Sequence, residues 1–287
     1  MDNNNPQNTE CQVRPDVINY DDVRKMVPAL DGHPKLVEKA FHLIGLDEVN
    51  RVHRTYCDTP GVKFAQRMVR DEFKFKLRID NLQVLSEFQE GPFITVSNHP
   101  FGSYDGILLI DVVGSFRPDY KVMVNLILNQ IQAMRPTFIA VDPLKSNDPE
   151  KKKITMQGIR NAMRHVKEGH PLGFFPSGAV AKFSFKKMRV EDLPWQPSII
   201  RLIQQLKVPV IPIYFHGHNS VLSYILGALD WRLRTLRLPK EVFRKYGADV
   251  HISIGDPISV ERQSRCESVE ALTELLRGET LALKSIK

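Results

Sequence analysis

The chain has 287 residues, which is enough for the core of one large or two small domains, and its 42% hydrophobic and 25% charged residues are typical of a globular protein. Its 40 basic and 33 acidic residues give a net charge of +7, which favours an anionic partner such as a membrane surface, a phosphate-bearing substrate or an acyl carrier. The sequence has no apolar run of about 18 residues and no signal-peptide pattern, which argues against a spanning helix and a leader.

Three scattered cysteines, Cys11, Cys57 and Cys266, give neither a disulfide framework nor a zinc spacing. Such an odd and sparse set is typical of a protein from a reducing compartment. The basic charge is also not accompanied by an aromatic-basic motif, so we expect no nucleic-acid partner.

The first 72 residues carry no strand pattern. Residues 1–15 are polar and rich in Asn and Gln, which predicts a disordered tail. Residues 16–72 are predicted to be an N-terminal helical segment, with short helices over 21–27, 33–44 and 47–56. Amphipathic helices of this kind either pack on the main core or lie on a membrane surface, and we favour packing on the core.

From residue 73 to residue 287, predicted strands alternate with predicted helices. The predicted strands cover 73–79, 93–97, 120–124, 138–141, 172–176, 208–215 and 250–255. The predicted helices cover 105–113, 126–134, 148–168, 193–206, 219–238, 241–246 and 268–286. The first strand alternates apolar and basic residues, which indicates a half-exposed edge strand, and the prolines of 208–215 predict an edge strand or a strand start. The alternation predicts an α/β fold with a mixed, mostly parallel central sheet flanked by helices.

One stretch, residues 93–106, combines a buried strand with a polar loop and a helix start. Its β-branched beginning predicts a strand, Pro100 and Gly102 predict a loop, and Asp105 opens the next apolar run as a helix. His99 therefore lies at the carboxyl end of a strand, where open α/β sheets bind ligands. An imidazole held by a carboxylate at one nitrogen takes a proton at the other, so His99 and Asp105 are a candidate general base and its orienting acid. The alternative is a structural loop histidine, with the aspartate as a helix cap.

A second stretch, residues 173–182, repeats this design, because an apolar strand runs into a loop of Pro, Ser and Gly. Loops of this kind present backbone N–H groups that hold an oxyanion or a phosphate. Lys182 adds positive charge near the loop, and so do Lys186, Lys187 and Arg189. The alternative is an ordinary turn.

A third apolar strand, residues 208–215, also ends in a polar loop. Its histidines, His216 and His218, are the candidate partners of His99 in a metal site. The sequence places no further ligands at metal-like spacing, so we expect no metal.

Together these three motifs resemble the glycerolipid acyltransferase family, of the lysophosphatidate acyltransferase type, over about residues 75–260. The family carries a His-x4-Asp motif, a Phe-Pro-Glu-Gly-Thr-Arg loop and a Val-Pro-x-x-Pro strand on a mixed sheet flanked by helices. It transfers an acyl group from a coenzyme A or carrier-protein thioester to a lysolipid hydroxyl. The resemblance implies that His99 is the general base and Asp105 its orienting acid. It further implies a set of acceptor contacts at Phe101, Gly102, Phe175, Pro176, Ser177, Gly178 and Lys182.

The chain departs from the family pattern in both of its first two motifs. Five residues rather than four separate His99 from Asp105, which resembles a bacterial branch of haemolysin-like or aminolipid acyltransferases. Ser177 stands where the family has Glu, and Ala179 begins the pair that replaces Thr-Arg. Lys182 is a point charge without the bidentate fork of an arginine. Because the acid and the arginine are missing, we favour a lyso-aminolipid acceptor of the glycine or ornithine type, with lysophosphatidate as the alternative acceptor.

The resemblance implies an O-acyltransferase domain over residues 73–287. Its co-substrate would be an acyl-carrier-protein or coenzyme A thioester, with no cofactor and no metal. Backbone N–H groups near Gly102 or Gly178 are the candidate donors to the oxyanion. The enzyme would be cytoplasmic and peripheral, bound to the anionic inner face of the membrane that supplies the lysolipid. The alternative is a catalytically inactive, membrane-associated protein that binds lipid with the same fold.

Overall fold

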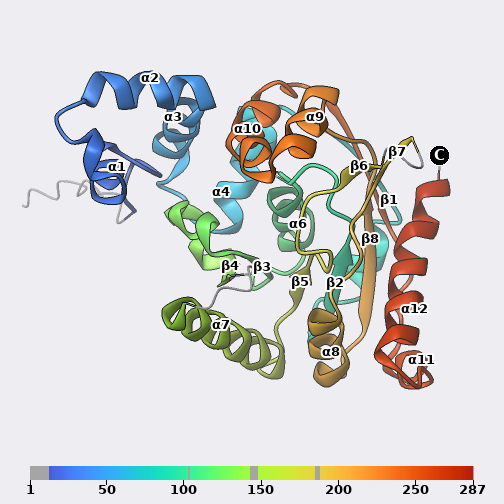
Figure 1. The fold of residues 1–287 in the computed structure, drawn as a ribbon. Coiled ribbons are helices and arrows are strands. Elements are labelled where there is room, and N and C mark those ends of the chain that lie inside the picture. Colours follow the sequence, from blue (N-terminus) through green and yellow to red (C-terminus); the bar gives the residue numbers. More distant parts are fainter. Residues whose placement is uncertain (1–12, 103, 143–147, 185–187, 287) are drawn as a thin grey trace, which may run out of the picture.

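The computed structural model describes residues 13–102, 104–142, 148–184 and 188–286. Within them, a seven-stranded sheet has the order β1-β9-β8-β2-β5-β3-β4, and β6 and β7 form a separate hairpin (Figure 1). The strands are β1 (Lys76–Asp80), β2 (Ile94–Ser97), β3 (Lys121–Asn125), β4 (Phe138–Val141), β5 (Leu172–Phe174), β6 (Lys182–Ser184), β7 (Arg189–Glu191), β8 (Val210–Phe215) and β9 (Asp249–Ile254).

Neighbouring strands of the large sheet run parallel, except for β8 and β9, which are antiparallel. Parallel neighbours need crossover connections, and helices form most of these connections. The predicted α/β fold, with a mixed and mostly parallel sheet flanked by helices, is confirmed. β1 is an edge strand, as its alternating pattern predicted.

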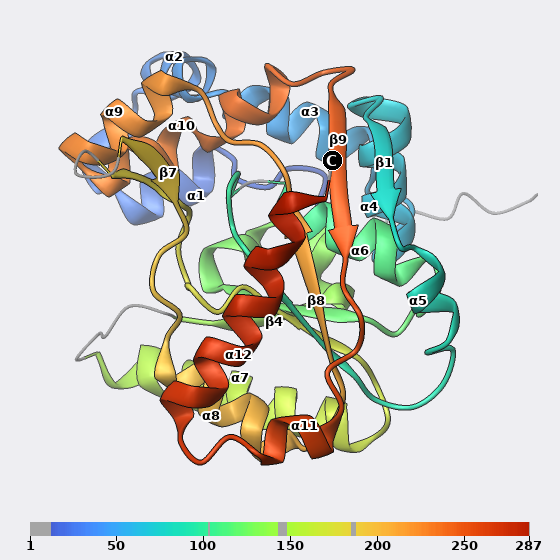
Figure 2. The same ribbon diagram turned by 90° about the vertical axis from the view of Figure 1, so that its right-hand side faces the viewer.

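Helices cover both faces of the sheet because successive strand residues point to opposite sides. In β8, Ile211 packs with α6 (Asp105–Gly114) and α4 (Val62–Arg67) in one core cluster. Val210 packs in the other cluster, with α7 (Pro149–Lys167), α8 (Pro197–Leu206) and α12 (Val269–Ala282). Figure 2 shows α12 in front of β8. The sheet therefore separates two apolar cores, and its strand ends are left for polar loops.

The remaining helices are short, and most of them lie before β1 or after β8. They are α1 (Tyr20–Met26), α2 (Pro34–Ile44), α3 (Leu46–Tyr56), α5 (Gln83–Ser86), α9 (Val221–Leu229), α10 (Trp231–Phe243) and α11 (Val260–Ser264), the 3-10 helices η1 (Pro28–Leu30), η3 (Leu126–Gln130), η4 (Gln132–Thr137) and η5 (Leu283–Ser285), and the π-helix η2 (Met68–Glu72). Within the described ranges, no helix combines the length and the apolar character needed to cross a membrane.

Of the N-terminal helices, α3 and α4 pack on the main core, as expected. Val52 and Tyr56 of α3 are buried in the same cluster as the sheet residues. Of the predicted tail, residues 1–12 lie outside the described residues, whereas the Arg14 backbone N–H donates to Gln132 at 3.1 Å. The ordered chain therefore already includes Arg14, and the division between a helical segment and a catalytic domain at residue 72 stays a prediction.

Of the two alternatives predicted for 208–215, the edge position is wrong, because β8 lies inside the sheet between β9 and β2. The strand start fits Pro209, which directly precedes β8. Pro212 lies within the strand, next to the last ladder pair of Ile213 and Ile254. Its carbonyl accepts the Gly255 N–H at 2.8 Å, so Pro212 takes part in the pairing as an acceptor only.

Two other elements also differ from prediction. The predicted helix 126–134 is a pair of 3-10 helices, η3 and η4, that meet at Ile131. The predicted strand 73–79 begins only at Lys76, because Lys74 has φ +50°, which is outside the extended region. Phe73 and Phe75 are nevertheless both buried, and their ring centroids lie 5.3 Å apart. The hairpin of β6 and β7 had no counterpart among the predicted elements.

Candidate active site

The loops that follow β8, β2 and β5 meet at one edge of the sheet, because these three strands are parallel neighbours. His99 lies two residues after the end of β2, and Asp105 is the first residue of α6. His99 Nδ1 lies 2.6 Å from Asp105 Oδ2. The two residues predicted as base and orienting acid are therefore in direct contact.

Asp105 is fully buried and tightly held. Its Oδ2 also accepts the backbone N–H groups of Phe101, at 3.1 Å, and Gly102, at 2.9 Å. Its Oδ1 has no hydrogen-bond partner among the described residues. An ionised carboxylate only accepts hydrogen bonds, so the Nδ1 of His99 must carry the proton in this contact. The lone pair of the neutral imidazole is then on Nε2.

The ring of His99 is fixed from one side by Phe175, whose ring stacks on it at 4.3 Å between centroids. The His99 side chain remains 17% exposed. Across the described part of the chain, no hydrogen-bond partner of its Nε2 is found. Phe175 is thus placed against the base, at the position where an acceptor contact was predicted.

A glycine in each of the first two loops allows close packing. Gly102 has φ +79°, and a Cβ on it would lie 2.2 Å from a methyl group of Val180 in the second loop. Gly178 has φ +66°, and a Cβ there would lie 1.9 Å from the side-chain amide of Gln196, the residue before α8. A larger residue at position 102 would therefore push the two loops apart.

Backbone hydrogen bonds join the same loops. The Ala181 N–H donates to the carbonyl of His99 at 2.8 Å, and the Gln196 N–H donates to the carbonyl of Pro176 at 2.8 Å. Pro176 therefore shapes the second loop through its backbone. The predicted binding residues of both loops are brought together, although their role in binding stays a prediction.

Ser177 and Lys182 do not present their polar groups to the base. Ser177 is buried, and its hydroxyl donates to the carbonyl of Ala179 at 3.0 Å. Lys182 is exposed at the start of β6, where it pairs in register with Glu191. Lys186 and Lys187, which were predicted to add charge here, lie outside the described residues, and Arg189 forms an ion pair with Glu191.

The N–H groups of Gly102 and Gly178 themselves are already engaged. The Gly102 N–H donates to Asp105, and the Gly178 N–H donates to the carbonyl of Phe175 at 2.9 Å. An oxyanion donor near either glycine stays a prediction, and it would be another N–H group of these loops.

Sequence reasoning missed a second carboxylate next to His99. Asp192 Oδ1 accepts the backbone N–H of His99 at 3.2 Å, and its Oδ2 accepts the indole N–H of Trp195 at 3.0 Å. Burial raises the pKa of Asp192, and these two hydrogen bonds, together with the charge of His99, act in the opposite direction. A lone acid 93 residues away from its partner gives no sequence signal.

Two amides that join the loops were also missed. Asn98 binds both backbone groups of Phe215 at the end of β8, with distances of 2.9 and 2.8 Å. Asn219 is buried and donates to the carbonyl of Phe101 at 2.9 Å. Lys245 adds a cation next to this loop, because its Nζ lies 4.6 Å from the centroid of the Phe101 ring, and burial lowers the pKa of Lys245.

The predicted metal candidates His216, His218 and His99 do not converge. In the described ranges, one other group brings three metal-ligand types together: His216, His251 and Asp80, with donor atoms within 4.8 Å of one another. The rings of His216 and His251 stack at 3.8 Å with planes only 9° apart. An ion must lie close to the plane of each ring that binds it, and parallel planes do not meet at a point. This arrangement does not fit a shared ion.

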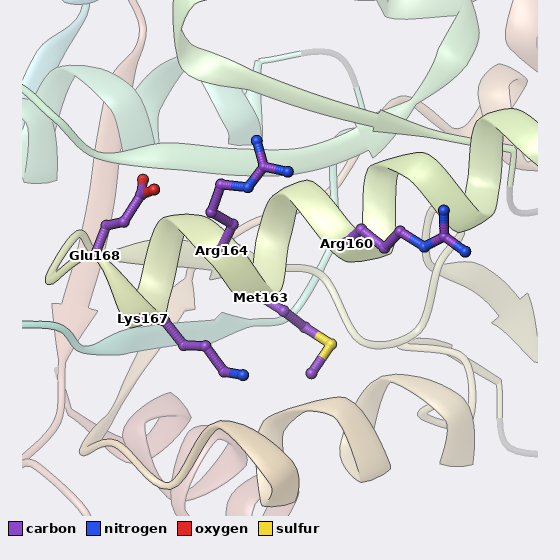
Figure 3. Close-up of a pocket in the computed structure, with 5 residues that line it drawn as sticks. All are labelled: Arg160, Met163, Arg164, Lys167 and Glu168. Carbon is purple, nitrogen blue, oxygen red and sulfur yellow. The ribbon is translucent and has the colours of Figure 1, made fainter.

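A hollow on the surface of α7 is also separate from the predicted site. Figure 3 shows the residues that line it, and none of them belongs to the loops around His99. They are Arg160, Met163, Arg164, Lys167 and Glu168.

Known proteins similar to this chain point to one class. A family model described as acyltransferase matches residues 30–286. A lyso-glycine lipid O-acyltransferase of Phocaeicola vulgatus is 23% identical, covering 86% of this chain and 89% of that protein. A lyso-glycine lipid O-acyltransferase of Bacteroides thetaiotaomicron is 25% identical, covering 75% of this chain and 78% of that protein.

The fold has a solved counterpart. The crystal structure of the 1-acyl-sn-glycerophosphate (LPA) acyltransferase PlsC from Thermotoga maritima aligns with a TM-score of 0.52 and 15% identity, covering 88% of each chain. At this identity the likeness concerns the fold alone. Because the family model covers most of the sequence, and the motifs resemble glycerolipid acyltransferases, the chain belongs to the acyltransferase family, among the glycerolipid acyltransferases.

Proposed function

We propose that this acyltransferase moves a fatty acyl group from a thioester to the hydroxyl of a lyso-glycine lipid. One observation carries the proposal. Asp105 holds His99 through Nδ1 at 2.6 Å, and the partly exposed ring keeps Nε2 without a partner among the described residues. This geometry suits a general base that takes a proton from the hydroxyl group of a substrate.

The proposed reaction uses no nucleophile from the protein. Nε2 of His99 takes the proton of the acceptor hydroxyl as its oxygen attacks the thioester carbonyl. Asp105 stabilises the imidazolium that forms, because it faces Nδ1–H as a buried carboxylate. The tetrahedral intermediate then expels the thiolate, which receives the proton from Nε2. The products are the acylated lipid and a free thiol, so atoms and charge balance.

The acceptor is proposed from two lines of support. Both similar bacterial proteins carry the name lyso-glycine lipid O-acyltransferase. In the second loop, Ser177 replaces the glutamate expected of lysophosphatidate enzymes, and Ala179 replaces the threonine of their Thr-Arg pair. The Ser177 hydroxyl donates to the carbonyl of Ala179 within the loop. The headgroup of a lyso-glycine lipid carries no phosphate for such an acid and arginine pair to bind. We also propose that the acceptor comes from a membrane, with an acyl-carrier-protein or coenzyme A thioester as donor.

The test is turnover by purified protein. Lyso-glycine lipid, lyso-ornithine lipid and lysophosphatidate are each offered with an acyl-carrier-protein or a coenzyme A thioester, and the diacyl product is measured. We expect the glycine lipid to be the best acceptor. His99→Ala should lower turnover by about 10³-fold. His251→Ala is the matched control, because His251 also pairs with an aspartate but lies outside these loops.

Three outcomes would decide between the proposal and its rivals. Faster turnover of lysophosphatidate would overturn the acceptor assignment. Full activity of His99→Ala would overturn the mechanism. Lipid binding without turnover on any acceptor would favour an inactive binding protein. The lipid profile of cells that carry the intact chain or His99→Ala then checks whether the same monoacylated precursor accumulates.

A further inference from the structure

The outer face of α9 is apolar. Its exposed residues are Val221 (73% exposed), Leu222 (44%), Ile225 (51%) and Leu229 (74%). At about 100° per residue these four side chains lie within an arc of about 100° on the helix. A contiguous apolar stripe on the outside of a helix marks an interaction surface rather than scattered surface residues.

The inner face of the same helix packs against the protein. Ser223 is fully buried, and Tyr224 is nearly so. The Tyr224 hydroxyl accepts the backbone N–H of Asn219 at 3.1 Å. A helix at the surface of a globular protein normally turns polar residues outward. The outer face of α9 is apolar instead, so this face is matched to a medium other than water.

Neighbouring elements add to this face. α10 packs beside α9 and exposes Leu236, and β6 of the hairpin also contacts α9. Figures 1 and 2 both place α9 and α10 along the same side of the molecule as α2. These neighbouring elements carry basic residues: Lys182 on β6, Arg189 on β7 (paired with Glu191), Lys240 on α10 and Arg244 directly after α10. Apolar side chains bordered by cations suit the surface of an anionic bilayer.

α9 is also joined to the candidate active site. Asn219, two residues before α9 begins, donates to the carbonyl of Phe101. The N–H of Phe101 in turn donates to Asp105, the partner of His99. The apolar face therefore begins next to the loop that holds the base.

We propose that the outer face of α9, with Leu236 of α10 and the surrounding basic residues, docks on an anionic lipid bilayer. The proposal rests on the proposed function, because a lysolipid acceptor resides in such a bilayer. α9 lies in the interface with its stripe among the acyl chains, and the cations meet the headgroups. An acidic carrier protein would use the cations but leave the stripe in water, so the bilayer is the better match.

The test is co-sedimentation of the full chain with vesicles. Vesicles of phosphatidylcholine with phosphatidylglycerol are compared with vesicles of phosphatidylcholine alone. The test variant is I225E with L229E, and the matched control is M156E, because Met156 is 53% exposed on α7. We expect stronger binding to the anionic vesicles, and at least about tenfold weaker binding of the I225E/L229E variant, since two buried apolar side chains are lost. The control should bind like the wild type.

Turnover separates this proposal from the proposed function. The ratio of turnover on vesicle-embedded acceptor to turnover on detergent-dispersed acceptor should fall in the I225E/L229E variant and stay unchanged in M156E. If vesicle binding depends on α9 but no acceptor is turned over, the proposed function is wrong and the docking surface is supported. Vesicle binding that does not depend on α9 would overturn the docking surface.

Oligomeric state provides the remaining outcome. The wild-type protein could instead form a dimer and not bind vesicles, with the I225E/L229E variant remaining monomeric. This result would make the stripe an interface between two copies and overturn the bilayer proposal. Because all of the changed side chains are exposed, the circular dichroism and the melting temperature of the variants should match the wild type.

Discussion

Among the described residues, two histidine–aspartate pairs lie near the same edge of the sheet, and they differ in burial and in the ring nitrogen that meets the carboxylate. In the first, His99 is 17% exposed, and Asp105 is buried and accepts two further backbone N–H groups. In the second, His251 and Asp80 are 22% and 21% exposed. His251 meets Asp80 through Nε2, and His216 stacks on its ring.

The contrast shows that a hydrogen bond to an aspartate does not by itself make a histidine a general base. His99 uses Nδ1 for its carboxylate, which leaves the outer nitrogen for a substrate. His251 uses its outer nitrogen for the carboxylate, and Ser253 also donates to that carboxylate at 2.8 Å. A free outer nitrogen, a buried partner and a fixed ring are what distinguish the first pair. The first three predictions test those features, in order of expected effect, and the last tests the second pair.

The largest effect is expected from the two histidines. His99→Ala should lower kcat/KM at least about 10³-fold, because general-base catalysis contributes about 10² to 10⁴ and Phe175 also loses its stacking partner. His251→Ala should change kcat/KM by less than about threefold, because His251 and Asp80 form a partly exposed pair that does not contact His99. Equal losses in both variants would mean that the second pair takes part in the reaction. Initial rates on the preferred acceptor measure both.

Asp105→Asn should cause the next largest loss, about 10²-fold in kcat. The amide oxygen can replace Oδ2 and keep its three donors, and the amide nitrogen takes the place of Oδ1, which has no partner among the described residues. The loop is therefore retained, while the negative charge that stabilises the imidazolium is lost. The measurements are kcat and the melting temperature. A stable variant with wild-type kcat would show that Asp105 only positions the ring.

Much of this site was predicted from the sequence, because its signal is local. Residues 93–106 carry a strand, a loop and a helix start in direct succession, so the contact of His99 with Asp105 follows from six residues of chain. The three motifs predicted three strand ends, and the parallel order of β8, β2 and β5 places those ends together. The mixed, mostly parallel sheet was predicted for the same reason.

The rest depends on contacts between distant segments. Asp192 and Asn219 reach the first loop from positions about one hundred residues away, and a polar residue in a loop carries no sign of its partner. The interior position of β8 was missed because proline, which has no N–H, looks incompatible with a central strand. The β8–β9 ladder covers only residues 213–215 of β8, so it requires no N–H from either proline. The engaged N–H of Gly102 likewise depends on a turn that the sequence does not specify.

Asp192→Asn should have an intermediate effect, about tenfold in kcat/KM. The two carboxylate oxygens face two donors, the His99 backbone N–H and the Trp195 indole, and an amide can accept only one of them. The loss of a negative charge near His99 also disfavours the imidazolium, so the acidic limb of the pH profile of kcat/KM should move to lower pH.

A double variant separates these two causes. Trp195→Phe together with Asp192→Asn removes the second donor, so the amide oxygen is free to accept the His99 N–H. The rate should recover in part, and the shifted acidic limb should remain. Recovery of both would mean that Asp192 acts on backbone position alone. Trp195→Phe by itself is the control for packing, since Trp195 is buried.

The smallest effect is expected from the second pair and concerns stability. The hydrogen bond from His251, and then that from Ser253, lowers the pKa of Asp80 below 3.8, against the opposing effect of burial. A carboxyl whose pKa is lowered in the folded state stabilises the protein above the unfolded pKa, and this contribution is lost as the pH falls through the folded pKa. His251→Gln should therefore lower the free energy of unfolding at about pH 7 by no more than about 1 kcal/mol, because the pair is partly exposed. At about pH 3, the difference between variant and wild type should shrink, and urea titrations at the two pH values measure it. A difference that grows toward low pH would mean that His251, rather than Asp80, dominates the linkage.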